Sequence, residues 1–238
     1  MKSVFTKLSL TALAAIPALL SAQTFVFDSV EGFSGVQGEN GWSYAYAPSA
    51  NVSDDLRATQ TAMTYYSEES LWKAGASGGL ANVRISAEEQ SYVGAAPGFP
   101  LRYWTADQDY NSVTFATSFV ADVNGVNPTI FYSTATGTQV KLVDKLTTTV
   151  GATVYSLDST DVADMTIEGS TNISGGTIYN VSAGDRIYFI SKSSGASQGS
   201  ALQPWTMEIT AVIPESSSSA LLVGVLTLGL IFCLRRRS

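Results

Sequence analysis

The chain has 238 residues, of which 45% are hydrophobic, and it carries a formal net charge of −7 with no histidine and one cysteine. The negative charge argues against a nucleic-acid ligand. The lack of histidine excludes Ser-His-Asp and Cys-His catalysis and removes the usual zinc ligand. Cys233, the one cysteine, has no partner for an intramolecular disulfide, so a folded domain must depend on its core.

The first 22 residues have the pattern of a secretory signal peptide. Lys2 and Lys7 give a basic start, an apolar stretch runs from Leu8 to Leu20, and the small residues Ser21 and Ala22 follow. This order predicts export by Sec-type machinery and cleavage by signal peptidase after Ala22. A retained signal-anchor helix is the alternative, but the apolar stretch is short.

Residues 23–212 are expected to form one antiparallel β-sandwich. Short stretches rich in Thr, Val, Ile and Tyr alternate with Gly, Asn and Ser turns, and only residues 67–73 suggest a helical turn. This spacing of strands predicts an all-β fold. Strands are expected within residues 24–30, 42–47, 112–123, 128–143 (a hairpin turning at Thr136-Gly137), 153–158, 176–193 and 204–213.

Aromatic residues are the candidate ligand-binding groups of this domain. Trp42, Tyr44 and Tyr46 alternate along one strand and therefore share a face. They would form a stacking platform for sugar rings, with Gln37, Glu39 and Asn40 as neighbouring hydrogen-bonding groups. The alternative, which we favour, is that they form the inward face of the sandwich, because large aromatic side chains dominate cores. Trp104 is expected in the core.

Trp72 is expected to be the most exposed tryptophan, since it lies in the loop-like stretch EESLWKAGASGG. It completes the set of candidate stacking residues.

The carboxylates give little support for catalysis or metal binding. Adjacent acidic pairs such as Glu68-Glu69 point to opposite faces of a strand. Only Asp107 and Asp109 share a face, and their polar surroundings would not raise the pKa of a general acid. With Asn111 they are also the candidate calcium ligands, although a solvated turn is favoured because no calcium-loop motif is present. We expect no catalytic residue and no cofactor.

The C-terminal residues combine a short apolar run with a basic tail. The run from Ala220 to Leu234 covers about 22 Å at about 1.5 Å per residue, and serines 216–219 extend it. We therefore expect a single transmembrane helix over about residues 217–234, with Arg235, Arg236 and Arg237 on the cytoplasmic side. A buried helix of a soluble domain is the alternative, but the run has no polar face.

This end of the chain resembles the PEP-CTERM sorting signal of exported Gram-negative bacterial proteins. In that family a Pro-Glu-Pro motif, a short transmembrane helix and a basic tail follow in this order. Pro214 and Glu215 match the motif, and Ser216 replaces the second proline. The resemblance implies a sorting signal over residues 213–238 (motif 213–216), processing by an exosortase-like enzyme, passage through the inner membrane, and delivery to the cell surface or extracellular matrix.

The middle of the chain is similar to uncharacterised bacterial β-sandwich modules of jelly-roll-like form. The similarity lies in FSGVQGENGWSYAY (Phe33–Tyr46), PLRYWTA (Pro100–Ala106) and VSAGDRIYFI (Val181–Ile190). Such modules are often found in sorted or carbohydrate-associated proteins, so the resemblance implies a fold rather than an activity.

Together these features predict a non-enzymatic structural or adhesive protein that contacts extracellular polysaccharide. A surface protein without a specific ligand is the main alternative, and a carbohydrate-active enzyme is the third. The domain alone has 8 basic and 19 acidic residues. These numbers follow from the 13 basic and 20 acidic residues of the chain when Lys2, Lys7, the three terminal arginines and Glu215 are left out. The resulting net charge of −11 suits an exported surface that must stay soluble.

Overall fold

The computed structural model describes residues 22–48, 55–92, 98–121, 126–144, 154–169, 171–193 and 200–213. Gln23–Pro214 form one compact unit, and Met1–Ala22 with Glu215–Ser238 form a second, of which only Ala22 is described. The expected signal peptide up to Ser21, the sorting motif, the transmembrane helix and the arginine tail lie outside the described residues. Within the described ranges, no helix is long and apolar enough to cross a membrane.

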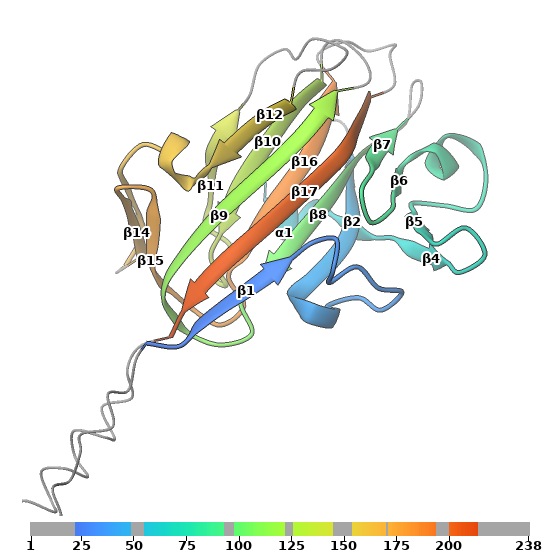
Figure 1. The fold of residues 1–238 in the computed structure, drawn as a ribbon. Helices are drawn as coiled ribbons and strands as arrows, with labels where there is room; N and C mark the ends of the chain where they lie inside the picture. Colours follow the sequence, from blue (N-terminus) through green and yellow to red (C-terminus); the bar gives the residue numbers. More distant parts are fainter. Residues whose placement is uncertain are drawn as a thin grey trace, which may run out of the picture. The chain divides into compact units, whose positions relative to one another are not determined.

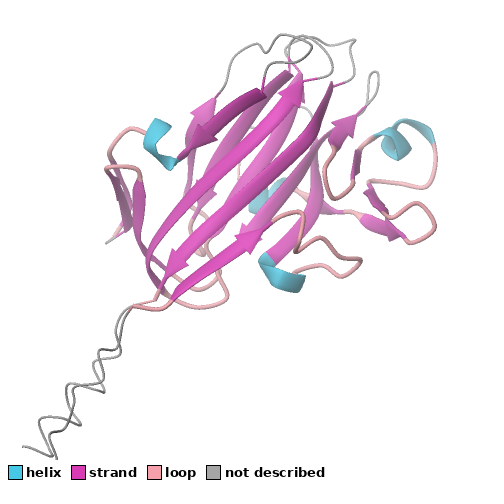
Figure 2. Cartoon of the chain, in the orientation of Figure 1, coloured by secondary structure: helices cyan, strands magenta, loops and turns pink. Residues whose placement is uncertain are grey.

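The domain is all-β and its strand pairs are antiparallel, as the sequence predicts (Figure 2). The larger of its two sheets, sheet A, has 11 strands. The order is β13-β14-β15-β9-β17-β7-β6-β5-β4, with β1 also pairing β17 and β12 also pairing β9. The strands are β1 Thr24–Asp28, β4 Thr64–Tyr66, β5 Leu71–Lys73, β6 Arg84–Ile85, β7 Gln90–Tyr92, β9 Tyr110–Ala121, β12 Val154–Asp158, β13 Met165–Glu168, β14 Thr171–Ser174, β15 Thr177–Val181 and β17 Ser200–Val212.

The second sheet, sheet B, has six strands in the order β11-β10-β16-β8-β2-β3. The expected hairpin within residues 128–143 is confirmed, because β10 and β11 pair and the backbone N–H of Gly137 donates to the carbonyl of Thr134. The strands of this sheet are β2 Trp42–Pro48, β3 Thr61–Ala62, β8 Gly98–Thr105, β10 Val126–Ser133, β11 Gln139–Asp144 and β16 Arg186–Ser193.

The few helical segments are all short. They are α1 Leu56–Thr59 and the 3-10 turns η1 Glu39–Gly41, η2 Gly78–Asn82 and η3 Ser159–Asp161. The expected helical turn over residues 67–73 is wrong: residues 67–70 form the turn between β4 and β5, and strand β5 follows. Glu69 and Lys73 have the four-residue spacing of a helical ion pair. They form an ion pair, with Nζ and Oε1 2.5 Å apart, but Glu69 lies in this turn and Lys73 in strand β5.

Strand β9 illustrates how the sequence specifies the sandwich. Val113, Phe115 and Phe119 alternate with partly exposed Ser112, Thr114 and Ser118, so one face of the strand is apolar and the other polar. An antiparallel sheet that packs on one side and meets water on the other requires this alternation. β9 and β17 lie side by side along most of their length, with β1 beside β17 and β12 beside β9 (Figure 1).

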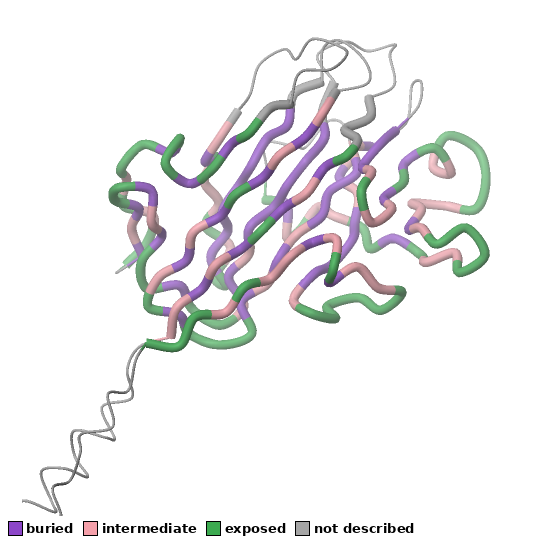
Figure 3. The backbone as a smooth tube through the Cα atoms, in the orientation of Figure 1, coloured by how far each residue is buried: buried purple, intermediate pink, exposed green. Residues whose placement is uncertain are grey.

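The main core lies between the two sheets, where the buried strands are seen in Figure 3. Phe115 of sheet A meets Phe189 of sheet B edge to face, with ring centroids 6.2 Å apart. Trp42 and Trp104 of sheet B and Trp205 of sheet A are at most 1% exposed. The expectation that Trp104 is a core residue is therefore confirmed.

The outer side of sheet B carries a smaller apolar cluster under α1. Leu56 of this helix is fully buried there. The other buried members come from four strands of the sheet: Ala45, Ala47, Leu101, Phe131, Tyr188 and Ile190. Part of this side of sheet B is therefore covered by the chain itself.

Arg102 of β8 lies at the inner side of sheet B and is completely buried. Its guanidinium donates to the carbonyls of Ser29, Ala87 and Ser86 at 3.2, 3.2 and 2.5 Å. It also lies 5.6 Å from the ring centroid of Tyr44. This one side chain ties β8 to the segment after β1 and to the turn between β6 and β7.

Candidate binding face of the eleven-stranded sheet

The three aromatic residues of the candidate stacking platform on β2 belong to the core. Trp42 is 0% and Tyr44 1% exposed, and Tyr46 is half-buried against the same cluster. The stacking hypothesis for these residues is therefore wrong, and the favoured alternative of an inward face is confirmed. The physical reason is that this face of β2 supplies much of the aromatic area that fills the space between the sheets.

Trp72 is also buried, which corrects the expectation that it is the exposed tryptophan. It is 3% exposed and stacks on Tyr44 with ring centroids 5.0 Å apart. Its indole N–H donates to the carbonyl of Ser34 at 2.9 Å. The polar residues around Trp72 resemble a loop, but it occupies the central position of strand β5 and its side chain enters the core.

The polar residues that precede β2 have structural tasks of their own. The side-chain amide of Gln37 donates to the carbonyl of Tyr44 at 2.7 Å and accepts from its backbone N–H at 2.8 Å. Gln37 thus acts as a substitute strand partner for β2. Glu39 and Asn40 begin the turn η1, and both are exposed.

Asp107 and Asp109 are exposed, and each holds a neighbouring group in place. Asp107 accepts from the Tyr110 hydroxyl at 2.6 Å, and Asp109 accepts from the backbone N–H of Ala183 at 2.8 Å. Burial, helped by the bond to Asp107, raises the pKa of Tyr110 to about 12. Among the described residues no group of three Asp, Glu, His or Cys side chains is arranged to hold a metal ion. The favoured reading of this stretch as a solvated turn agrees with these contacts.

The side of sheet A that points away from the core is the remaining candidate. We use the term open face for the outward side of β1, β17, β9 and β12. Strand register aligns its residues into rows that cross the four strands at about 4.8 Å per strand. Because the side chains of an antiparallel sheet alternate, every second row faces outward.

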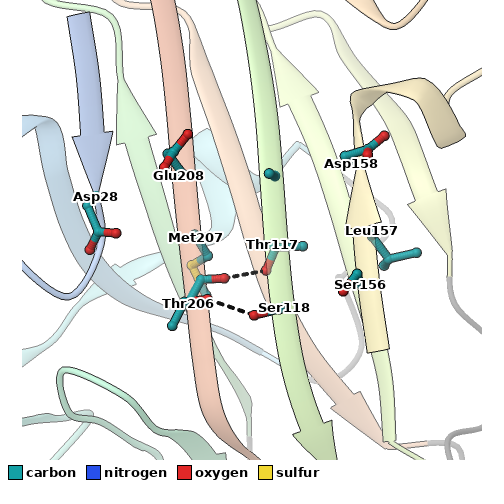
Figure 4. Close-up of a pocket in the computed structure, with 10 residues that line it drawn as sticks. Asp28, Thr117, Ser118, Ser156, Leu157, Asp158, Thr206, Met207 and Glu208 are labelled. Carbon is teal, nitrogen blue, oxygen red and sulfur yellow. Dashed lines mark hydrogen bonds between the residues drawn. The ribbon is translucent and has the colours of Figure 1, made fainter. Parts of the chain in front are cut away.

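Two neighbouring rows of the open face are polar. In the carboxylate row, the register places Asp28 opposite Glu208, Glu208 opposite Ala116, and Ala116 opposite Asp158 on adjacent strands. In the hydroxyl row, Thr206 pairs with Ser118 and Ser118 with Ser156. The hydroxyls of Ser118 and Thr206 lie 2.9 Å apart and share a hydrogen bond (Figure 4).

These rows line a depression with a volume of about 260 Å³. A second depression of about 360 Å³ is lined by residues of β1 and of the segment between β1 and β2, and Asp28 lines both. Figure 4 shows the side chains of Asp28, Glu208 and Asp158 around the first depression, on β1, β17 and β12, with β9 between the last two strands. The lining of the second is Val26, Phe27, Asp28, Glu31, Gly32 and Asn40.

The two depressions are electrostatically negative. The described residues that line them include the carboxylates of Asp28, Glu31, Asp158 and Glu208 and no lysine or arginine. Asp158 caps η3, and its hydrogen bonds from the Thr160 hydroxyl and backbone N–H hold the pKa of Asp158 below its usual range. Asp28 caps the turn after β1 by accepting from the backbone N–H groups of Val30 and Glu31 at 2.7 and 3.0 Å.

The arrangement offers hydrogen-bond acceptors on a fixed frame. Asp28 and Asp158 are held by their turns, whereas the side chain of Glu208 is exposed and has one long contact, 3.5 Å from the Thr210 hydroxyl. Serine and threonine hydroxyls both donate and accept, and ionised carboxylates accept only. A ligand that carries many hydroxyl groups matches this surface.

Sequence reasoning did not single out these residues. The visible signal is the run of Ser, Thr and Ala at every second position of β9, from Ser112 to Ser118, which marks a solvent-facing strand without large side chains. What the sequence lacks is the register that places Asp28, Glu208 and Asp158 in one row.

Comparison with known proteins identifies no family. No family model and no curated protein matches the chain. A mutant of CBM29-2, a family 29 carbohydrate-binding module, is similar over 81% of this chain and 87% of its own, at 8% identity and a TM-score of 0.35.

Two further solved structures are similar to a comparable degree. The family 11 carbohydrate-binding module of the cellulosomal cellulase Lic26A-Cel5E of Clostridium thermocellum matches over 82% of this chain and 96% of its own, at 12% identity and a TM-score of 0.34. The enzymatically active domain of tailspike protein 4 of bacteriophage CBA120 matches over 76% of this chain and 21% of its own, at 13% identity and a TM-score of 0.32. Likeness at this level assigns neither a ligand nor an activity.

Proposed function

We propose that this chain is an exported, non-enzymatic β-sandwich module that binds a polysaccharide on its open face. The observation that carries the proposal is the pair of polar rows on β1, β17, β9 and β12, whose carboxylates and hydroxyls line the first depression, which shares Asp28 with the second. A sheet is a rigid support for such groups, since its strands fix their spacing.

The chemistry of the two rows suits sugar hydroxyls. Each sugar hydroxyl can donate to a carboxylate oxygen, and hydrogen bonds to an ionised acceptor are stronger than neutral ones. The hydroxyls of Ser118 and Thr206 offer both donor and acceptor capacity beside these carboxylates. The small side chain of Ala116, between Glu208 and Asp158 in the carboxylate row, leaves room for a sugar ring.

The charge of the open face favours an uncharged polymer. The depressions are lined by four carboxylates, and the whole chain has a net charge of −7. An acidic polymer would be repelled there, because like charges at close range are unfavourable.

Binding without catalysis is the reading that the carboxylates support best. A glycosidase needs a general acid whose pKa is raised. Asp158 has the opposite property, a lowered pKa, and Asp28 is engaged in capping a turn.

A binding assay with the full-length chain in a neutral detergent tests the proposal. We expect at least one uncharged polysaccharide, from a panel of mannan, xyloglucan, mixed-linkage glucan and amylose, to slow the chain in affinity electrophoresis. Glu208→Ala should weaken that binding about tenfold, the usual effect of removing a charged hydrogen-bond acceptor.

Glu68→Ala is the matched control, because Glu68 is an exposed glutamate in the turn between β4 and β5, away from the two depressions. An equal loss in both variants would contradict the proposed site. No binding to any polymer of the panel would favour the alternative of a structural surface protein without a ligand.

Export and sorting form the second part of the proposal. The N-terminal signal pattern, the jelly-roll-like resemblance and the sorting signal over residues 213–238 support a protein delivered to the cell surface or extracellular matrix after passage through the inner membrane. We expect protein recovered from the surface of the native host to end close to Glu215. Mass spectrometry of surface fractions that finds an intact Ser238 would contradict cleavage at Pro214-Glu215-Ser216.

A further inference from the structure

The outer side of sheet B presents two neighbouring arginines, Arg57 of α1 and Arg186 of β16, beside Tyr103 of β8 and Tyr188 of β16. Both arginines and Tyr103 are partly exposed, while Tyr188 is buried. We call these four residues the arginine cluster. It lies on the opposite sheet from the depressions of the open face.

Arg57 is fixed in place by three hydrogen bonds. Its Nε donates to the Ser133 hydroxyl at 2.9 Å, and its Nη2 donates to the carbonyls of Ser133 and Gly184 at 3.0 and 2.6 Å. Ser133 of β10 is the register partner of Arg186 on β16. The Arg57 guanidinium is therefore anchored on the residue directly opposite Arg186.

Arg186 is held by the two tyrosines. Its Nη1 donates to the Tyr188 hydroxyl oxygen at 3.2 Å, and its guanidinium carbon lies 4.8 Å from the ring centroid of Tyr103. The two tyrosine rings are themselves 5.1 Å apart. Stacking on an aromatic face fixes the plane of a guanidinium and costs little hydration.

Among the described residues, neither of the two arginines has an ion-pair partner. Within the described part of the chain, ion pairs are formed by Lys73 with Glu69 and by Arg84 with Glu89, and neither Arg57 nor Arg186 takes part in one. Burial, and after it the charge of Arg186, lowers the pKa of Arg57.

The carboxylates of Asp185 and Asp55 act electrostatically on the Arg57 guanidinium, but their hydrogen bonds are made with other groups. Asp185 accepts from the Tyr132 hydroxyl and from the backbone N–H groups of Ala135 and Ser182, and Asp55 caps α1 by accepting from the backbone N–H of Arg57. Two partly buried guanidinium groups of the same charge, side by side, are unfavourable unless an anion joins them.

We propose that the arginine cluster is a second binding site, which takes the carboxylate or sulfate group of an acidic glycan. Arginine is suited to this ligand, because its planar fork of N–H donors matches two oxygens of an oxyanion. The choice of a glycan as the carrier of this oxyanion rests on the proposed function. The open face, with its carboxylates, would not accept the same polymer, so the two sheets select for different ligands.

Calorimetric titration of the full-length chain in a neutral detergent at low ionic strength tests this site. The probes are an oligogalacturonate, a sulfated galactan oligosaccharide and uncharged oligosaccharides of mannan, xyloglucan, mixed-linkage glucan and amylose. We expect at least one acidic probe to bind, more weakly as salt is added. Arg186→Gln should lower its affinity about tenfold or more, because a charged hydrogen bond is lost.

Arg84→Gln is the matched control, since it removes the same charge from a side chain that is 45% exposed on strand β6. It should change the affinity less than about twofold. Arg186→Lys keeps the positive charge but loses the planar fork of N–H donors, so we expect it to bind the acidic probe more weakly than the unaltered chain does. This variant replaces Arg186→Gln in the test if Arg186→Gln does not fold. Binding of the galacturonate or of the sulfated probe identifies the oxyanion.

Three results would overturn the arginine cluster as a site: no acidic probe binds, Arg84→Gln weakens binding as much as Arg186→Gln, or Arg186→Lys leaves the affinity unchanged. The uncharged probes separate the two proposals. Failure of every uncharged probe to bind, together with acidic binding that depends on Arg186, would reject the open face and retain the arginine cluster. Binding of an uncharged probe without binding of any acidic probe would reject the arginine cluster alone.

Discussion

At the scale of single residues, Arg102 combines full burial with a positive charge, and it forms no ion pair with any described residue. Burial lowers the pKa of Arg102 to about 10, although the charges of Tyr44 and Asp28 oppose that shift. Backbone carbonyls of Ser29, Ser86 and Ala87 replace part of the hydration that the guanidinium loses, by accepting from its two Nη groups. Such a group is costly to bury and costly to remove, because each carbonyl would then lose its donor.

We therefore expect Arg102→Met to lower the free energy of unfolding by about 3 kcal/mol, from carbonyls left without donors and an imperfectly filled space. Urea unfolding of the full-length chain, followed by tryptophan fluorescence, measures this loss. Arg84→Met, at an exposed position, should cost less than about 1 kcal/mol. Equal costs in the two variants would show that Arg102 does not tie the segments together.

At the scale of strands and turns, much of the fold could be predicted from the sequence. The alternation of apolar and polar residues locates β1, β2, β9, the β10-β11 hairpin, β16 and β17, because an antiparallel strand with one buried face has a period of two residues. Short segments were harder. Strand β5 has three residues, too few for its alternation to be distinguished from a loop, and its Trp72 was for that reason expected outside the core.

The candidate site could not be predicted in the same way. Asp28 and Glu208 come from opposite ends of the domain, and only the antiparallel register of β1 on β17 makes them neighbours. The same holds for Arg57 and Arg186, which meet because the side chain of Arg57 reaches the strand next to β16. Local patterns identify which face of a strand is buried, but they do not contain the pairing of distant strands.

The aromatic residues are the more visible signal in the sequence, and they belong to the core: the favoured interpretation of Trp42 and Tyr44 is confirmed, and the expectation that Trp72 is exposed is wrong. Trp42 and Tyr44 alternate in the way that a stacking platform requires, yet the same alternation describes a strand whose aromatic side faces the core. The small hydroxyl-bearing residues of β9 are less conspicuous, but they occupy the side that reaches water.

At the scale of the whole domain, the two sheets present surfaces of different chemistry. The open face of sheet A carries the carboxylates of Asp28, Asp158 and Glu208, and Glu31 lines the depression beside it. The outer side of sheet B carries Arg57 and Arg186 beside two tyrosines. A module with these two surfaces would connect an uncharged polymer to an acidic one, which is a suitable property for a protein placed at a cell surface or in a secreted matrix.

The central claim is that a polysaccharide occupies the open face, and a steric block tests it most directly. Ala116 is exposed at the middle of the carboxylate row, so Ala116→Trp would fill the depression, whereas Ala76→Trp places the same side chain in an exposed loop outside it. The measurement is calorimetric titration of both full-length variants with the uncharged oligosaccharide that the unaltered chain binds. We expect at least a tenfold loss of affinity in Ala116→Trp at an unchanged unfolding temperature, and no loss in Ala76→Trp. Full affinity in a folded Ala116→Trp variant would contradict the claim.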